Sequence, residues 1–535
     1  MTEAGPTGRR WLVVLLVCTF VACLGVSYLD EDAFISFRVV DNAVHGYGLR
    51  WNVDERVQVY TNPLWVLALI PLHAVFRDIA PASWLLSATV STAAVGVVAR
   101  RLVAEPLWLV LGFLFPLAAS QAFIDYTNSG LENPMLYLGI ALFAERAMRP
   151  GPPDWLVVCT VASLSAVTRL DAFLLFAPTL LVWALQEGRR APWGRIALGA
   201  SPVVAWLAFA TFYYGTPFPN PKYAKLNAGI PRLAYVEKGF VYLGDMARND
   251  AVTFLGLIAA FAVAGWLVAT RRGRAESTVV TLLSGSALYS AYVVAVGGDF
   301  MAGRYWTSPF FLAVVTLALW GPIREPGRLA ALAGGLLFVR FGLQPMIEEK
   351  DVIETRDHGR FAIVRSGGLR LQRYNCGFYE ALIGSRGPLR AHDWSKEGLA
   401  HRAEAEAAHA AKPGQNYVIV EGNVGKVPYF GGPGVTYIDR LGVADALIAR
   451  LPDADGKFQL IGHLERDIPA GYVEARETGS LDAMDPRLQR WYAAQRLVIA
   501  GDLFDPARLA AIVTMNLGTN DADLREYVRG LREQK

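Results

Sequence analysis

The chain has 535 residues, of which 53% are hydrophobic and 19% are charged, and its net charge at pH 7 is +3. Soluble domains carry about 25% charged residues, so this composition favours a membrane protein. The small net charge and the short, scattered basic clusters argue against nucleic acid as a partner. The cysteines, Cys18, Cys23, Cys159 and Cys376, form no CxxC or Cys/His grouping, which argues against a disulfide framework and a zinc site.

Apolar runs follow one another along the first two thirds of the chain. The first, from Trp11 to Tyr28, follows Arg9 and Arg10 and is not followed by a clear A-x-A cleavage pattern. We expect an uncleaved first transmembrane helix with its N-terminus in the cytoplasm. Further candidates are 60–76, 83–99, 105–123, 131–147, 154–169, 171–186, 193–212, 251–270, 277–296, 308–321 and 328–345. A crossing needs about 20 apolar residues, so this pattern predicts a multi-spanning α-helical membrane protein with about 10–12 transmembrane helices.

The composition changes after about residue 346, where polar and apolar residues alternate as in a soluble α/β segment. Segments such as HGRFAIVRSGGLR and KPGQNYVIVEGNVGKVPYFGG show this pattern. We therefore predict a transmembrane catalytic domain at 1–345 and a C-terminal soluble domain at 346–535. The histidines of the second domain have no metal-ligand spacing, and AHRAEAEAAHAAK (400–412) is typical of an exposed helix.

Positive charge on short loops orients the spans, because cytoplasmic loops are enriched in lysine and arginine. Arginine clusters near 146–149, 189–195 and 271–274 are therefore predicted to be cytoplasmic. This places the first external loop, 28–60, on the opposite side together with the polar segments near 130, 170, 213–226 and 297–306 and the C-terminal domain. The orientation requires an even number of crossings between 59 and 125, so one of the three runs there is not a full crossing.

The most acidic of these segments is YLDEDAFISFR (28–38), in which Asp30, Glu31 and Asp32 directly follow the first apolar run. One interpretation is that Asp30 or Asp32 caps a short interfacial helix. The other is a carboxylate held at the membrane surface as a general base, with its neighbours raising its pKa. Arg38 lies on the amphipathic stretch that follows.

Two further segments join a helix start to a polar side chain. Asn62 precedes Pro63 in VYTNPLW, and Glu132 precedes a helix start in NSGLENP, where the helix dipole favours a carboxylate. In TRLDAF, Arg169 and Asp171 lie in a short break between two apolar runs and form either a structural ion pair or part of a site.

Two loops carry cations suited to phosphate. Lys222 and Lys225 lie in the Pro-rich aromatic loop YYGTPFPNPKYAKL (213–226), which is either an interfacial anchor or a seat for a lipid-linked phosphate. VGGDFMAGRYW (296–306) combines glycines with Asp299 and Arg304, and this combination favours a ligand site.

Taken together, these motifs resemble the GT-C superfamily of membrane glycosyltransferases, and most of all the terminal arabinofuranosyltransferases of mycobacterial cell walls and their bacterial relatives. The resemblance covers most of 28–310 and rests on DEDAFISFR, TNPLW, SGLE, the R-x-D break and GGDFM-x-GR, with a weaker similarity at GVTYIDRLGVAD (434–445). Members of the family typically show Asp-Asp where this chain has Glu31-Asp32. Asp30 is an additional acid, so the partner of Asp32 is either Asp30 or Glu31.

The resemblance implies a reaction class, its substrates and a location. The expected function is transfer of a sugar, arabinofuranose, from a polyprenyl-phosphate donor to a glycan or glycoconjugate of the cell envelope. We expect the protein to lie in the bacterial inner (plasma) membrane, with the active site on the extracytoplasmic face. Asp32 would act as base, or as nucleophile if configuration is retained. The cations expected to stabilise the leaving phosphate are Arg38, Lys222, Lys225 and Arg304. Further residues expected to bind substrate are Asn62, Glu132, Arg169, Asp171 and Asp299. No cofactor is required by the pattern, although carboxylates and phosphate would suit Mg²⁺ or Ca²⁺.

Two alternatives use the same residues differently. The first is a GT-C hexosyltransferase or mannosyltransferase that acts on protein, pilin or lipopolysaccharide. The second is a transporter or flippase of a lipid-linked sugar, which predicts ionisable residues along the spans and an inverted repeat. The charged residues instead concentrate at the span ends on one face, and the sequence shows no repeat.

Overall fold

The computed structural model describes residues 6–102, 107–226, 229–270, 274–320, 352–356, 360–366, 369–375, 393–454 and 464–533. The predicted span at 328–345, the predicted domain boundary near 345, and Cys376, His358, His392 and His463 lie outside these residues. The chain forms two compact units. Unit 1 comprises Met1–Asp30, Ala80–Val203 and Arg232–Gly384, and unit 2 comprises Glu31–Ile79, Val204–Pro231 and Ser385–Lys535.

This grouping joins segments that are distant in the sequence. Residues 31–79 and 204–231, which the sequence pattern assigned to the transmembrane domain, lie in unit 2 with the C-terminal residues. The division at 1–345 and 346–535 stays a prediction, and the two units are described separately below.

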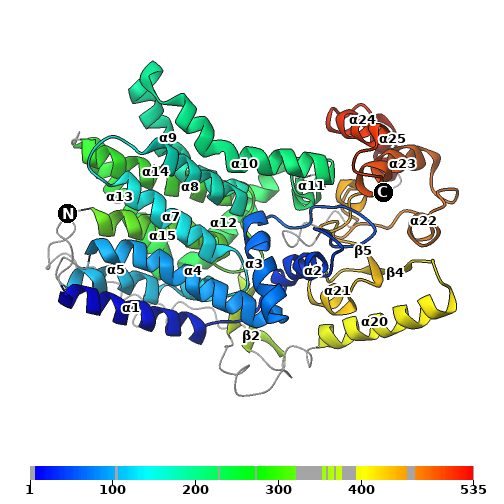
Figure 1. Cartoon of the computed structure of the whole chain (residues 1–535), viewed down its shortest axis with the longest axis horizontal. Coiled ribbons are helices and arrows are strands. Elements are labelled where there is room, and N and C mark those ends of the chain that lie inside the picture. The colour runs from blue at the N-terminus through cyan, green and yellow to red at the C-terminus, as the bar shows by residue number, and fades with distance from the viewer. Residues whose placement is uncertain are drawn as a thin grey trace. The chain divides into compact units, whose positions relative to one another are not determined.

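Unit 1 is a helical assembly (Figure 1). Its helices are α1 (Pro6–Gly25), α4 (Ile79–Leu102), α5 (Leu107–Ala119), α6 (Gln121–Thr127), α7 (Asn133–Ala147), α8 (Trp155–Thr168), η1 (Leu170–Ala172), α9 (Phe173–Glu187), η2 (Gly188–Arg190), α12 (Arg232–Asn249), α13 (Ala251–Ala269), α14 (Arg274–Ala295), η3 (Arg304–Trp306) and α15 (Thr307–Leu319). Helix α10 (Trp193–Tyr214) begins in unit 1 and ends in unit 2.

Six of the described helices are long and apolar enough to cross a membrane. They cover Gly8–Gly25, Ile79–Leu102, Leu170–Arg190, Trp193–Tyr214, Ala251–Ala269 and Glu276–Ala295. Helix α1 leaves most of its apolar side chains exposed, as expected of a helix that faces lipid. These helices confirm the prediction of a multi-spanning α-helical membrane protein.

The helix lengths also bear on the three apolar runs between 60 and 123. Helix α4 has 24 residues and can span the bilayer, whereas α3 (Pro63–Phe76) has 14 and α5 has 13. The shorter helices are therefore the candidates for the incomplete crossing. The amphipathic helix α12 was not predicted, because its mixed polar and apolar residues do not form an apolar run.

Close packing in unit 1 depends on α15 and on small residues. Helix α15 contacts α5, α7, α13 and α14, and most of its residues are buried. Glycines let the other helices approach closely, because a Cβ atom would collide with the neighbour. These contacts join Gly139 to Ser165, Gly285 to the Leu175 carbonyl and Gly239 to the Val294 carbonyl.

Unit 1 also contains a three-stranded antiparallel sheet of β1 (Val352–Arg356), β2 (Arg360–Ser366) and β3 (Leu369–Asn375). Strands β2 and β3 pair from Arg360 opposite Asn375 to Ser366 opposite Leu369. Residues Arg360–Ser366 of the segment HGRFAIVRSGGLR thus form β2, as the alternating pattern predicts.

Unit 2 combines helices with a short parallel sheet. Its elements are α2 (Ala33–Val44), α3, the end of α10, α11 (Asn220–Leu226), α20 (Asp393–Ala411), β4 (Tyr417–Glu421), α21 (Lys426–Gly431), β5 (Val435–Asp439), η6 (Ile448–Arg450), α22 (Tyr472–Thr478), α23 (Pro486–Ala500), α24 (Pro506–Asn516) and α25 (Asp521–Glu533). Strands β4 and β5 pair in parallel, and α21 connects them. Helix α20 is largely exposed, as predicted for 400–412.

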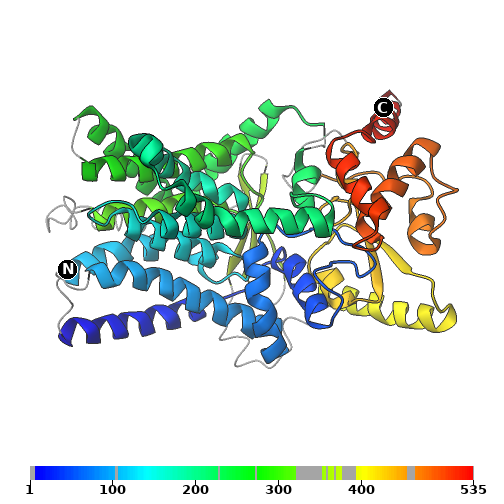
Figure 2. The same cartoon turned by 45° about the horizontal axis from the view of Figure 1, so that its top comes forward.

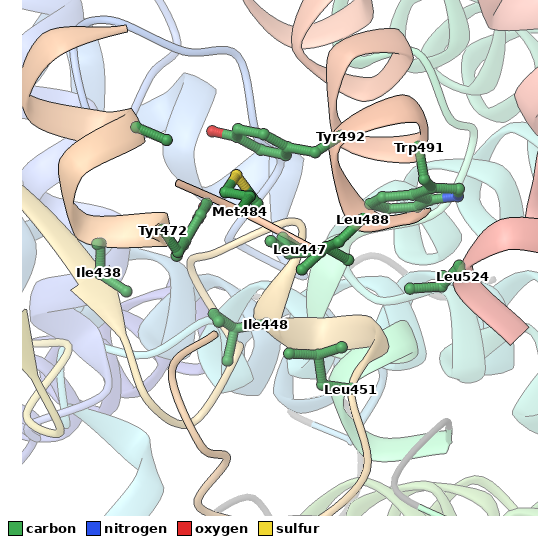
Figure 3. Packing of buried hydrophobic residues seen from close by; sticks show 11 residues of the cluster. Ile438, Leu447, Ile448, Leu451, Tyr472, Met484, Leu488, Trp491, Tyr492 and Leu524 are labelled. Carbon is green, nitrogen blue, oxygen red and sulfur yellow. The ribbon is translucent and has the colours of Figure 1, made fainter. Parts of the chain in front are cut away.

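The core of unit 2 lies between β5, η6 and the C-terminal helices. Figure 3 shows Leu447, Ile448 and Leu451 facing Trp491 and Leu488, with Leu524 of α25 beside them. Helix α23 contacts both α24 and α25, which Figure 2 shows as the red elements near the C-terminus. The chain leaves β5 through a turn in which the buried carboxylate of Asp439 accepts the backbone N–H groups of Leu441 and Ala444. The 434–445 segment therefore has a structural role in ordering this turn.

Candidate active site

The acidic segment is divided between the two units. Asp30 is fully buried in unit 1, where its backbone N–H donates to the Ser129 carbonyl at 3.0 Å. Glu31 and Asp32 belong to unit 2 and are only half-buried. Glu31 is therefore the acid that shares a compact unit and a helix start with Asp32.

Asp32 occupies the N-cap position of α2. Its backbone is helical, with φ of −61° and ψ of −25°, and its side chain makes no cap hydrogen bond to the described first turn. The capping interpretation requires such a bond, because the usefulness of an aspartate at this position lies in accepting an N–H of the first turn. The geometry thus favours a role for the Asp32 carboxylate other than helix capping.

Glu31 meets the loop that precedes α21. Its Oε1 accepts the backbone N–H of Lys426 at 2.7 Å, and a Cβ at Gly425 would lie only 2.2 Å from the Glu31 carbonyl oxygen. The buried Oε2 has no hydrogen-bond partner among the described residues. The Lys426 ammonium lies 5.6 Å from the centre of the Phe34 ring on α2. Gly425 and Lys426 are functional candidates that sequence spacing could not identify, because they lie nearly 400 positions away.

Burial raises the pKa of Glu31 to about 7, and the nearby Lys426 charge only partly opposes this effect. A raised pKa means that folding favours the protonated carboxyl. Its contribution to stability is present below the ordinary pKa near 4.5 and is lost as the pH rises through about 7. We expect a change from about pH 5 to about pH 8 to lower the unfolding temperature of the wild type more than that of Glu31→Gln.

This difference is measured by thermal unfolding of the purified protein in detergent. Glu406→Gln is the matched control, because Glu406 is 70% exposed on α20 and pairs with the exposed Arg402. An equal pH response of the wild type and Glu31→Gln would contradict the buried, protonated state of Glu31.

Arg38 is buried within unit 2. It is 2% exposed, and its guanidinium donates to the Trp51, Pro428 and Val435 carbonyls. The rings of Trp51 and Tyr437 lie 4.9 and 5.1 Å from its central carbon. Its donors thus bind backbone carbonyls within unit 2, and its contact with a leaving phosphate stays a prediction.

Asn62 also has a local partner. It is the N-cap of α3 without a side-chain cap bond to the described turn, and its Oδ1 accepts the Ser36 hydroxyl at 3.0 Å. Helices α2 and α3 contact one another, so this bond lies at their interface. Its proposed substrate contact stays a prediction.

Unit 1 brings together five of the predicted site residues. Glu132 Oε1 accepts Arg169 at 2.9 Å and Arg304 at 3.4 Å. Asp171 binds Arg169 in bidentate fashion at 2.8 and 3.0 Å, and Asp299 lies 3.5 Å from Arg304. All five side chains are at most 10% exposed. The two guanidinium groups are therefore matched by carboxylates of the protein, which supports the structural reading of the R-x-D break.

Lys222 and Lys225 lie on α11 in unit 2. Lys222 is exposed, and its ammonium is 3.3 Å from the centre of the Phe218 ring, whereas Lys225 is half-buried. The loop is fixed by Asn220, whose amide donates to the carbonyls of Gly442, Val443 and Asp445. Asn220 was not predicted as important, because these contacts join residues more than 200 positions apart.

The residues around Glu31 do not fit a divalent cation well. Glu31 Oε1 is already hydrogen-bonded, and the Lys426 ammonium opposes additional positive charge beside it. In another part of unit 2, the ligand atoms of Glu397, His401 and Glu421 lie within 4.8 Å of one another. The helical spacing of Glu397 and His401 is visible in the sequence, but Glu421 joins them only through the fold.

Comparison with known proteins identified two similar enzymes, and no protein-family model matched. A "terminal beta-(1->2)-arabinofuranosyltransferase" of Corynebacterium glutamicum is 27% identical over 371 residues, covering 59% of this chain and 53% of the relative. One of Mycobacterium tuberculosis is 25% identical over 330 residues, covering 53% of this chain and 51% of the relative. The chain thus spans about half the length of the curated relatives it matches. It is a distant homologue of these transferases, which supports a glycosyltransferase activity.

Proposed function

We propose that the protein is a membrane glycosyltransferase that transfers arabinofuranose from a polyprenyl-phosphate donor to a cell-envelope glycan at the extracytoplasmic face. The observation that carries this proposal is the homology to two enzymes named for terminal arabinofuranosyl transfer. The helices of membrane length support a lipid-anchored donor, because such a donor keeps its tail in the bilayer.

The reaction requires one bond to form and one to break at the anomeric carbon of the donor. The acceptor hydroxyl oxygen attacks this carbon, and the bond from the carbon to the phosphate oxygen breaks. The phosphate keeps the electron pair and leaves as polyprenyl phosphate. The hydroxyl proton passes to Asp32, which we assign as general base.

Glu31 is the proposed partner of Asp32. Its Oε1 is held by the Lys426 N–H, whereas its buried Oε2 has no partner among the described residues. This second oxygen is the atom that we assign to the acceptor hydroxyl, because an unpaired buried oxygen costs free energy until a ligand satisfies it. Asp30 is assigned to anchoring the segment, since its backbone is bonded to Ser129 in unit 1.

The leaving phosphate requires positive charge. The Arg38 guanidinium already donates its hydrogen bonds to backbone carbonyls. We therefore assign stabilisation of the leaving phosphate to Lys426, with Lys222 and Lys225 as further candidates. The proposed reaction uses no Mg²⁺ or Ca²⁺, because the residues around Glu31 do not favour binding of a divalent cation.

The direct test supplies the purified, membrane-reconstituted protein with a panel of polyprenyl-phospho sugars and an arabinan acceptor. We expect transfer from the arabinofuranosyl donor with release of polyprenyl phosphate, and little transfer from mannosyl or glucosyl donors. Product release is followed by mass spectrometry of both the glycan and the lipid. Efficient transfer of a hexose alone would overturn the assignment of the sugar, and lipid movement without turnover of any donor would overturn the enzyme itself.

A further inference from the structure

Unit 2 contains a cavity of about 690 Å³ that shares no lining residue with the acidic segment. Its walls come from residues 56–58, the chain that follows α10, η6 and the helices α23 to α25. The volume lies in the range of pockets that bind small molecules.

The charge of this cavity is unbalanced. Four guanidinium groups, those of Arg56, Arg450, Arg525 and Arg529, line it together with a single carboxylate, that of Asp521. Within the described part of the chain, none of the four arginines forms an ion pair with a carboxylate. The cavity therefore carries an excess of positive charge.

Neighbouring arginines on α23 behave differently. Arg487 binds Asp485 at 2.7 Å, and Arg490 binds Asp523 at 2.7 Å. Neither of them lines the cavity. The absence of carboxylate partners in the described structure is thus a property of the cavity arginines and not of this helical region as a whole.

One of the cavity arginines is buried and a second is half-buried. Arg56 is 4% exposed, and its Nε has no hydrogen-bond partner among the described residues. The half-buried Arg450 has the rings of Tyr223 and Trp491 at 4.5 and 5.6 Å from its central carbon. Buried charges are rarely left without a counter-charge, because desolvation costs several kcal/mol per ion. An anion bound in the cavity would supply the missing charge.

Apolar side chains form another part of the walls, which begin where a helix of membrane length ends. Val57, Val498, Met515 and Leu524 line the cavity, and so does Trp491 of the core in Figure 3. Tyr214 and Gly215 also line it, and Tyr214 is the last residue of α10, which is long and apolar enough to cross a membrane. In a bilayer, lipid phosphates lie just outside the hydrocarbon core, where a crossing helix ends.

We propose that this cavity binds the phosphate group of a lipid, with the arginines on the phosphate oxygens and the apolar wall against the adjoining carbons. Arginine suits phosphate because its planar fork can donate two parallel hydrogen bonds. The lipid is either polyprenyl phosphate, an identity that rests on the proposed function, or an anionic phospholipid of the bilayer. Both sources share the phosphate chemistry that the cavity recognises.

The test measures lipid retention by native mass spectrometry of the purified full chain. The protein is mixed with phosphatidylcholine alone, or with added undecaprenyl phosphate or phosphatidylglycerol, and glycerol phosphate serves as the soluble probe. We expect preferential retention of an anionic lipid over phosphatidylcholine. Preference for undecaprenyl phosphate identifies the substrate lipid, and equal retention of phosphatidylglycerol identifies a general headgroup site. Retention without preference for an anionic lipid, or binding of glycerol phosphate alone, would overturn the proposal.

The variants separate the cavity from general charge. Arg525→Ala/Arg529→Ala removes two exposed cavity arginines and should weaken anionic lipid binding by at least about tenfold. Arg487→Ala/Arg490→Ala removes the same charge from the same helical region outside the cavity, and its binding should be unchanged. Equal weakening in both double variants would contradict a specific site. If the wild type transfers sugar but retains no anionic lipid, only this site is refuted. If the wild type retains anionic lipid but transfers no sugar, only the proposed function is refuted.

Discussion

Asp32→Asn is expected to reduce sugar transfer by about 10²- to 10⁴-fold, the usual contribution of a positioned general base. Asparagine preserves the shape of the side chain but cannot accept the proton of the acceptor hydroxyl. Asp32 makes no side-chain cap bond to the described first turn of α2, so the helix does not need its charge to begin. The loss should therefore appear in kcat, while the KM for the donor changes little.

Transfer of radiolabelled sugar in reconstituted membranes measures this effect, and thermal unfolding verifies that the variant is folded. Asp482→Asn provides the control, because Asp482 is an exposed carboxylate in the same unit. Asp32→Glu should recover part of the activity, since it restores a base at an altered distance. A fully active, correctly folded Asp32→Asn protein would disprove the role assigned to Asp32.

Arg169→Gln is expected to destabilise the protein by about 3–5 kcal/mol, the usual cost of breaking a buried ion pair from one side. The Arg169 guanidinium binds both Asp171 oxygens and Glu132. Without it, the cluster would contain three carboxylates, those of Glu132, Asp171 and Asp299, and one arginine, Arg304. Glu132→Gln should lower the free energy of unfolding by less, because the two arginines of the cluster then still face two aspartates.

Unfolding in detergent with increasing denaturant measures both variants. Arg402→Gln is the control, because its ion pair with Glu406 is exposed and should contribute no more than about 1 kcal/mol. If Arg169→Gln were as stable as Arg402→Gln, the cluster would not be a structural element of unit 1, and its arginines would be available to a substrate phosphate.

Local signals made a large part of the fold predictable. Runs of membrane length predicted helices α1, α4, α9, α10, α13 and α14, because a helix in lipid must be apolar over about 20 residues. Alternation predicted β2 and β4, and the absence of an apolar run hid α12. For the candidate site, clustering of carboxylates at the end of the first run indicated Glu31 and Asp32, and the break in TRLDAF indicated Arg169 and Asp171.

By itself, the sequence thus determined the class of protein, the positions of its apolar helices and the acidic segment at their start. Only the tertiary structure decided what those residues contact. It placed the Lys426 N–H on Glu31, turned Arg38 towards the Pro428 and Val435 carbonyls, and united Glu132 with Arg169 and Arg304. These pairs are separated by 37 to 397 positions, whereas helix and strand periodicity relate only residues a few positions apart. Contacts between residues distant in the sequence therefore distinguish Glu31, which is proposed for chemistry, from Arg38, which binds backbone carbonyls within the fold.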